Sequence, residues 1–200
     1  MGSPEYSHSS GEVLIDGIDL LSLEVWERAQ LGIFLSFQNI PEILGINMGE
    51  YLRIIYNNYL KNQNNTDGKV AQLSPFVFKR FIKKYLDELK INEDFLKRDL
   101  NVGFSGGEKR KIELLQIKLL NPKYIILDEI DSGLDVDALK VVSNGIKEIN
   151  SPNNSIIIIT HHFEITKYID IDKIYVLKNG LLDRVGGKEI IDDILENGFN

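Results

Sequence analysis

The second half of the chain alternates short apolar runs with longer amphipathic stretches. KYIILDE (123–129) and SIIIITHH (155–162) each hold four consecutive apolar residues and end in polar or charged side chains. Short runs of this kind are typical of buried strands. Because the stretch between them, DALKVVSNGIKEI (137–149), reads as a helix, the order predicts a parallel sheet with helices on its faces, that is, an α/β fold.

The first forty residues contain shorter signals of the same fold. EVLIDGIDLL (12–21) alternates and turns at Asp16-Gly17, which predicts a strand leaving a hairpin-like turn, and LEVWERA (23–29) predicts a short helix. LGIFLSFQ (31–38) is mostly apolar and ends in a polar residue, so we expect another buried strand there.

The end of the chain predicts a hairpin and a final helix. A short helix near FEITKYI (163–169) precedes KIYVLKNGLLDRV (173–185), in which Asn179-Gly180 interrupts alternating residues. This dipeptide is a strong hairpin signal, so we expect the sheet to end in an antiparallel pair. KEIIDDILENG (188–198) then predicts a closing helix.

The middle of the chain predicts an all-helical insert. MGEYLRIIYNNYL (48–60) and SPFVFKRFIKKYLDELKI (74–91) read as helices, with Ser74 and Pro75 at the cap and first position of the second, and 61–69 is a polar loop. The second helix carries an amphipathic stripe: Phe78, Phe81, Ile82, Tyr85, Leu86 and Leu89. We therefore divide the chain into 1–47, a helical subdomain at 48–100, and 101–200.

Composition narrows the classes of function. The 200 residues are 43% hydrophobic and 26% charged, which suits a globular domain with a core. A formal net charge of −7 argues against a surface built for phosphate backbones, so we expect no nucleic-acid partner. With no cysteine, the chain supplies no disulfide and no thiolate ligand. No apolar run approaches the ~20 residues of a membrane-spanning helix, so we expect no direct membrane insertion.

Polar side chains follow three of the expected strands. Asp128 and Glu129 end one strand, His161 another and Gln38 a third. Ligands bind at the carboxyl ends of strands in open α/β sheets. Asp128 suits a hydrated Mg²⁺, Glu129 suits activation of a water, and a histidine at a strand end could bond a transferring phosphoryl group. Each residue taken alone also has an ordinary structural explanation.

The stretch VGFSGGEKRK (102–111) admits two readings. Ser105 and Glu108 have the spacing of a capping box, which satisfies helix-start N–H groups without a ligand. The same serine, the unobstructed backbone of Gly106 and Gly107, and the helix dipole could also face an anion. We expect the basic residues that follow, 109–111, to be solvated or to bind locally.

In this order, these features resemble the ATP-binding-cassette (ABC) ATPases. The resemblance implies a RecA-like sheet with a helical subdomain, with ATP and Mg²⁺ as cofactors. Gln38 matches the Q-loop, FSGGE the signature motif, YIILDE the Walker B strand, Ser132 to Asp135 the D-loop and His161 the switch histidine. It further implies that Glu129 and His161 are catalytic and that Asp128 and Gln38 hold the metal. The residues implied to bind nucleotide are Gln38, Ser105, Gly106, Gly107, Glu108, Asp128 and Asp135.

Within these ATPases the chain looks like the SufC family, which serves the SUF system of iron–sulfur cluster assembly. The segments that show this resemblance are DEIDSGLDVDALKVV (128–142), NVGFSGGEKRK (101–111), FQNIPEI (37–43) and PEYSHSSGEV (4–13). The resemblance implies SufB- and SufD-like scaffold partners and an ATP-dependent head-to-tail homodimer. It also implies a plastid-type organelle, which the abundance of asparagine, isoleucine and lysine favours, or a bacterial cytoplasm.

The sequence contains no P-loop motif, GxxxxGK[ST]. Gly68-Lys69 and Gly187-Lys188 are each followed by the wrong residue and lack the upstream glycine. In the family the P-loop precedes the segment matched by 4–13, so we expect an N-terminally truncated cassette. Because the P-loop holds the β- and γ-phosphates, we expect this chain to be inactive alone and to offer its signature motif to another copy's ATP.

Two other functions remain open on the sequence. The nucleotide-binding subunit of an ABC membrane transporter is disfavoured by the missing Pro-Thr after Asp128-Glu129 and by the wording DSGLDVDAL (131–139). A non-catalytic interaction module with the same fold is the other alternative.

Overall fold

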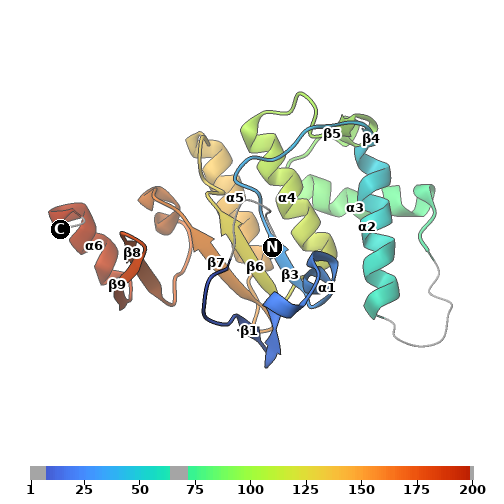
Figure 1. The fold of residues 1–200 in the computed structure, drawn as a ribbon. Coiled ribbons are helices and arrows are strands. Elements are labelled where there is room, and N and C mark those ends of the chain that lie inside the picture. The colour runs from blue at the N-terminus through green and yellow to red at the C-terminus, as the bar shows by residue number, and fades with distance from the viewer. Residues whose placement is uncertain (1–7, 64–71, 199–200) are drawn as a thin grey trace.

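A computed structural model describes residues 8–63 and 72–198 of the chain. Its central sheet is parallel and consists of β3 (Ile33–Leu35), β6 (Tyr124–Asp128) and β7 (Ser155–Ile159), with β6 in the middle (Figure 1). The α/β fold and the parallel sheet are thus confirmed. The first residues of 4–13 and most of the polar loop 61–69 lie outside the described part.

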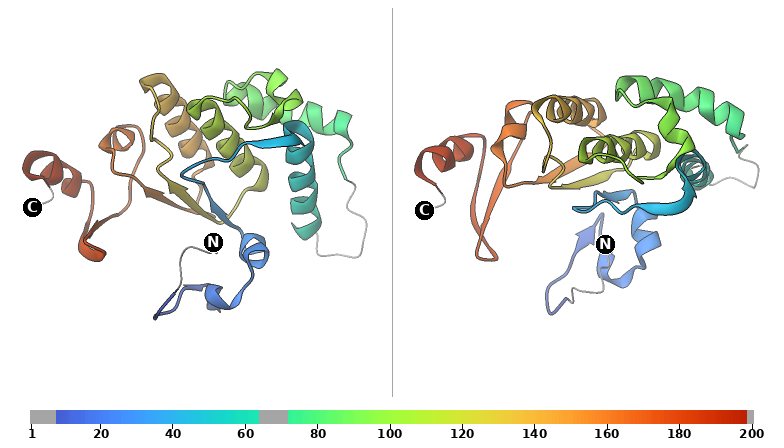
Figure 2. Two further views of the ribbon diagram at one scale, coloured as in Figure 1. Left: turned by 45° about the horizontal axis from the view of Figure 1, so that its top comes forward. Right: turned by 90° about the horizontal axis from the view of Figure 1, so that it is seen from above.

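Two helices cover one face of this sheet. They are α4 (Gly106–Leu120) and α5 (Val136–Ile149), and Figure 2 shows them on the same side of the strands. The register pairs Ile125 with Ile156 and Leu127 with Ile158, so these four side chains share a face. Ile125 and Leu127 are each 1% exposed and belong to the main core, which explains why this face is apolar.

The prediction that β7 is a buried strand was wrong for two of its four isoleucines. Ile157 and Ile159 are 57% and 50% exposed, whereas Ile156 and Ile158 pack against the core. Successive side chains of a strand point to opposite faces. In the described part of the chain, β7 pairs on one edge only, with β6, and the side chains on its second face are exposed.

The middle segment contains the expected helices. They are α2 (Met48–Gln63), α3 (Pro75–Glu88) and the short 3₁₀ helix η2 (Glu93–Lys97). The Ser74 hydroxyl accepts a hydrogen bond from the Val77 amide, with Pro75 at the first helical position, as predicted. The amphipathic stripe is confirmed as well: Phe78, Ile82, Leu86 and Leu89 are buried, and Phe81 and Tyr85 pack beside them.

A strand pair missed by the sequence analysis flanks this helical segment. β4 (Ile43–Asn47) pairs antiparallel with β5 (Asp99–Leu100) across an irregular register. All residues of β4 are exposed, so the strand has no alternation of buried and exposed positions that could have identified it. The pair brings the chain before α2 beside the chain after η2.

The ends of the chain form hairpins. β1 (Leu14–Ile15) and β2 (Ile18–Asp19) turn at the predicted dipeptide and lead through η1 (Leu20–Ser22) to α1 (Val25–Gln30). After η3 (Phe163–Lys167), the chain forms β8 (Ile174–Lys178), β9 (Leu181–Gly186) and α6 (Glu189–Asn197).

The predicted C-terminal hairpin exists, but it does not extend the parallel sheet. β8 and β9 form a two-stranded sheet of their own and are not hydrogen-bonded to β7. Val176 packs with Ile190 and Ile194 of α6 in a small second core, which gives the hairpin a separate source of stability. No helix among residues 8–63 and 72–198 is long and apolar enough to cross a membrane.

Candidate functional site

Two strand-end side chains lie beside the carboxylate of a third. The Gln38 Nε2 amide donates to Glu129 Oε2 over 3.1 Å, and His161 Nδ1 lies 3.1 Å from Glu129 Oε1. The three residues follow β3, β6 and β7, which are neighbouring strands of one parallel sheet. The structure therefore brings together the residues that the sequence places at separate strand ends.

The backbone around Glu129 explains this position. Glu129 has a φ of 48°, in the left-handed region, so the chain turns sharply as it leaves β6. Its amide donates to the carbonyl of Ile159, which ties the turn to β7. The amide of the preceding Asp128 donates to the hydroxyl of Ser36, a side chain only 1% exposed at the end of β3. Both neighbouring strands thus hold this turn.

Asp128 and Gln38, which the sequence predicts to hold a metal ion, carry oxygen atoms of the kind that Mg²⁺ prefers. Mg²⁺ takes one or two protein carboxylates or amides and fills its remaining positions with water and phosphate oxygens. Gln38 bonds Glu129 through its nitrogen, so its oxygen faces elsewhere. Across residues 8–63 and 72–198, no cluster of three or more His, Cys, Asp or Glu side chains could hold a metal. The residues present fit a metal held largely by nucleotide and water, not a protein cage.

The signature segment forms the capping box that its spacing predicts. Ser105 is the N-cap of α4: its hydroxyl accepts from the Glu108 amide, and Glu108 Oε2 accepts from the Ser105 amide over 2.7 Å. The Ser105 backbone hydrogen bond lowers the pKa of Glu108. In the described part of the chain, no hydrogen bond or ion pair joins these two residues to Glu129 or His161.

The two signature glycines have different surroundings. A Cβ on Gly106 would meet no atom within 4 Å, so the helix start is open there. A Cβ on Gly107 would lie 3.3 Å from the Cβ of Ala138, on the first turn of α5. Asp135 caps that helix by accepting from the Ala138 amide over 2.7 Å. The signature and D-loop segments are therefore packed together.

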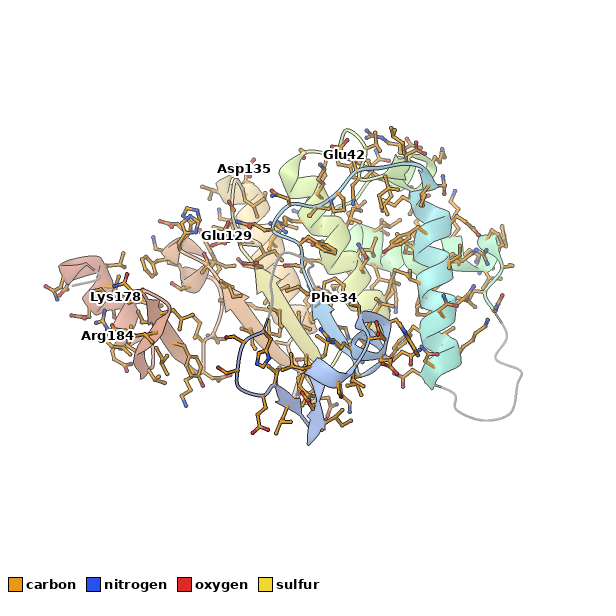
Figure 3. All side chains as sticks on the ribbon, viewed as in Figure 1. Phe34, Glu42, Glu129, Asp135, Lys178 and Arg184 are labelled. Carbon is orange, nitrogen blue, oxygen red and sulfur yellow. The ribbon has the colours of Figure 1, made fainter. Side chains whose placement is uncertain are left out.

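Figure 3 shows where the two groups of predicted residues lie. Glu129 lies beyond the end of β6, and Asp135 lies further along the loop, at the start of α5. The structure thus forms a strand-end group around Glu129 and a helix-start group at α4 and α5.

The basic run was misread at Arg110. We expected 109–111 to be solvated or bound locally, but Arg110 is only 5% exposed and, besides its local pair with Glu113, donates to backbone carbonyls of residues 37, 38 and 129, far away in the sequence. Lys109 pairs with Glu42, 67 positions away in the chain. Of the three basic residues, only Lys111 has a purely peripheral contact, with the carbonyl of Lys90. The i,i+3 spacing of Arg110 and Glu113 on a helix was the available signal for their pairing.

Two further polar residues near His161 escaped the sequence analysis. Thr160 donates its hydroxyl to Asp131 Oδ2 over 2.7 Å, and Asp131 is 7% exposed. The Thr160 hydroxyl also accepts from the His162 amide over 2.9 Å. These contacts fix the turn that carries His161, so Asp131 and Thr160 belong to the site. Nothing in their sequence spacing indicates this contact.

Comparison with known proteins identifies the class. The family described as ABC transporter matches residues 3–132, about two thirds of the chain. The chain therefore belongs to the ABC ATPase family, and its nucleotide-binding function is that of this family. Members of this class bind ATP together with Mg²⁺.

The individual relatives come from algae and bacteria. The chain is 43% identical over 199 residues to slr0075 of Synechocystis and 42% identical to ycf16 of Cyanophora paradoxa, both named probable ATP-dependent transporters. It is also 39% identical to vegetative protein 296 of Bacillus subtilis. Each match covers 100% of this chain and 74–76% of the relative.

Solved structures show the same fold. A nucleotide-free ATP-binding cassette from an ABC transporter superposes with a TM-score of 0.70 at 25% identity, covering 96% of this chain and 76% of that one. The cassette MJ1267 gives a TM-score of 0.68 at 26% identity, covering 94% and 74%. The ABC ATPase fold expected from the sequence is thus confirmed.

Proposed function

We propose that the chain is the SufC-type ATPase component of the SUF system, in which ATP binding and hydrolysis drive iron–sulfur cluster assembly. The observation that carries the ATPase part is the convergence of Gln38, Glu129 and His161 within hydrogen-bond distance. A carboxylate held between an amide and an imidazole at the strand ends is equipped to orient a water for attack on a γ-phosphate.

Each residue of the strand-end group has a proposed role. Glu129 activates the water. His161 contacts Glu129 through Nδ1, which leaves Nε2 of this 61% exposed side chain available to the γ-phosphate. Asp128 and Gln38 would hold Mg²⁺, which would neutralise negative charge on the phosphates when bound. Ser36, Asp131 and Thr160 position these groups through the contacts described above.

The helix-start group has a different proposed role. Ser105, Gly106, Gly107 and Glu108 form a phosphate clamp that acts on ATP bound by another subunit, in a head-to-tail dimer. The open space over Gly106 leaves helix-start N–H groups accessible, and the positive end of α4 favours an anion. Asp135, beside this clamp at the start of α5, belongs to the same subunit boundary in this proposal.

The absence of a P-loop motif from this sequence limits what the chain does alone. We propose that it does not hydrolyse ATP by itself, because the sequence contains no match to the motif whose lysine and backbone hold the phosphates. It would instead complete the site of a copy that carries a P-loop.

A complementation experiment tests this proposal. The Synechocystis relative, with its signature serine replaced by arginine so that its own clamp fails, is mixed with this chain. We expect ATPase activity to return, and to be lost again with Ser105→Arg. Glu129→Gln should have no effect in this mixture, because Glu129 would lie in a site without a P-loop. No rescue by the unaltered chain would contradict the clamp.

Partner binding tests the SUF assignment. The sequence DEIDSGLDVDALKVV supports assignment of the chain to the SufC family. The proposed partners are SufB- and SufD-like scaffold proteins. Co-purification with such proteins is the expected result, whereas recovery of an integral membrane protein would favour the transporter alternative. A chain that binds partners, yet still binds no ATP after a P-loop segment is added at its N terminus, would be a non-catalytic module.

The relatives also bear on where the protein works. Algal ycf16 proteins and a cyanobacterial protein are among them, which supports a plastid-type organelle or a bacterial cytoplasm as the compartment.

A further inference from the structure

One guanidinium group inside the molecule contacts two strand-end segments of the proposed ATPase site. Arg110 lies on α4, just after the signature motif, and is 5% exposed. Its Nη1 donates to the carbonyl of Phe37 and to Glu113 Oε2, each over 2.7 Å. Its Nη2 donates to the carbonyls of Gln38, at 3.2 Å, and Glu129, at 3.0 Å.

The partner carboxylate closes the arrangement from the other side. Glu113 Oε1 accepts from the Phe37 amide over 2.9 Å, while its Oε2 accepts from Arg110. The backbone of Phe37 is therefore held at its N–H by Glu113 and at its carbonyl by Arg110. Since the Phe37 side chain itself is 59% exposed, burial of that ring does not fix this segment.

Burying the charges of Arg110 and Glu113 away from water costs desolvation free energy. Desolvation raises the pKa of Glu113, an effect that the hydrogen bond from Arg110 opposes. A well-packed apolar pair of similar volume is often as stable as a buried ion pair, or more so. Stability of the core alone therefore does not account for charges here. Backbone carbonyls at the ends of β3 and β6 need a donor with several N–H groups, and an arginine provides it.

We propose that Arg110 and Glu113 are a positioning pair for the ATPase site. They hold the Phe37–Gln38 segment so that the Gln38 amide stays within reach of the Glu129 carboxylate. They also connect α4 to both strand ends, so that a movement of the signature segment is transmitted to Glu129. The effect of this pair on ATP hydrolysis rests on the proposed function. Its effect on the Phe37–Gln38 segment does not.

A purely structural pair makes a different prediction from a positioning pair. If the pair only fills the core, replacing both residues by apolar ones of similar size, Arg110→Met with Glu113→Leu, should restore a normal fold and a normal Phe37–Gln38 segment. If it positions that segment, the double variant folds but leaves the segment loose, because methionine and leucine offer no hydrogen bonds to the backbone.

Hydrogen–deuterium exchange and histidine NMR on the full chain separate these outcomes. In the double variant we expect the Phe37 amide to exchange at least about tenfold faster, while amides in the middle of α5 are unchanged. The His161 ring proton should also shift, because Glu129 and Gln38 lose their fixed relation. Unchanged exchange at Phe37 and an unchanged His161 signal in a folded double variant would overturn the proposal.

Conservative and control variants complete the test. Arg110→Lys keeps the charge but can contact fewer carbonyls, so it should give intermediate exchange at Phe37. Exchange equal to that of the unaltered chain would contradict the need for the forked guanidinium. Lys118→Met is the matched control: Lys118 is also a largely buried cation of α4, paired with Glu88 and Glu148 away from the site. It should leave Phe37 and His161 unchanged.

These readouts need no ATP, so they do not depend on the proposed function. Failure of the complementation experiment with normal Arg110 results would reject the clamp and leave the positioning pair intact.

Discussion

Glu129 owes its position to contacts with both neighbouring strands. Its carboxylate lies between Gln38 and His161, its amide bonds the carbonyl of Ile159, and its own carbonyl accepts from Arg110. Its amide, its carbonyl and one carboxylate oxygen thus form hydrogen bonds, and the other carboxylate oxygen lies beside His161. A charged residue with a positive φ at a strand end is a strained and specifically held position, which is common at functional sites.

The first prediction concerns this carboxylate. In a version of the chain extended at its N terminus by a P-loop segment, Glu129→Gln should lower steady-state ATP hydrolysis at least about 100-fold, because a general base typically contributes 10²–10⁴. ATP binding should persist, since glutamine keeps the size and one of the two acceptor oxygens. Glu164→Gln, an exposed acid on η3, is the control. Normal hydrolysis by the Glu129 variant would remove Glu129 from the mechanism.

The second prediction concerns the pH dependence of the capping box. The pKa of Glu108 is lowered from 4.5 in the folded chain, by the Ser105 backbone first. The folded state therefore binds fewer protons, and the charge of Glu108 contributes stability that is complete above pH 4.5 and is lost as pH falls through the lowered value.

Glu108→Gln keeps a hydrogen-bond acceptor but removes that charge. At pH 7 the variant should be less stable by about 0.3–1 kcal/mol, the usual effect of an anion at a helix start. The difference in unfolding free energy from urea titrations should shrink toward zero on acidification below the folded pKa. A difference that stays constant between pH 7 and pH 3 would mean that the charge of Glu108 does not stabilise α4.

At the scale of the secondary structure elements, an element could be predicted from the sequence when its signal came from neighbouring residues. The capping of α3, the stripe on that helix and both hairpin turns follow from neighbouring residues, and the structure confirms them. β4 has no buried face, and β5 has only two residues, so neither produces a periodic signal. Their pairing arises from chain segments about fifty residues apart, which no local pattern encodes.

The site shows the same division. The strand-end positions of Asp128, Glu129, Gln38 and His161 could be predicted because each follows an apolar run. Ser36, Asp131 and Glu113 could not, since their importance comes from contacts with distant segments: the amide of Asp128, the hydroxyl of Thr160 and the amide of Phe37.

The third prediction separates structure from function at the start of α4. Gly106→Ala places a methyl group in open space, so stability should change by less than about 0.5 kcal/mol. The same methyl group covers the exposed helix start, so rescue in the complementation experiment should fall at least about tenfold. Gly107→Ala instead crowds Ala138 and should destabilise by about 1 kcal/mol, within the usual range for overpacking.

Urea titrations and the rescued ATPase rate measure both effects. Full rescue by a folded Gly106→Ala chain would contradict a phosphate contact at this helix start. Equal stability of the two alanine variants would show that α5 moves away to accommodate the added methyl at Gly107.

For the molecule as a whole, the important asymmetry is between the two faces of the sheet. α4 and α5 cover one face, and the main core lies between them and the strands. At β7 the second face is exposed, although parallel sheets are normally covered on both sides. The run of four isoleucines concealed this difference, because a uniform apolar sequence fits both a fully buried strand and a half-exposed one.

The last prediction measures this asymmetry with two neighbouring residues. Threonine keeps the β-branched shape of isoleucine, so replacement changes polarity more than strand propensity. Ile158→Thr puts a hydroxyl against the core and should lower the unfolding free energy by more than about 1 kcal/mol. Ile157→Thr, at a side chain 57% exposed, should change it by less than about 0.5 kcal/mol. Urea titrations at two protein concentrations give both values. Equal losses at both positions would mean that the second face is covered in solution, and a loss at Ile157 that grows with protein concentration would identify self-association as the cover.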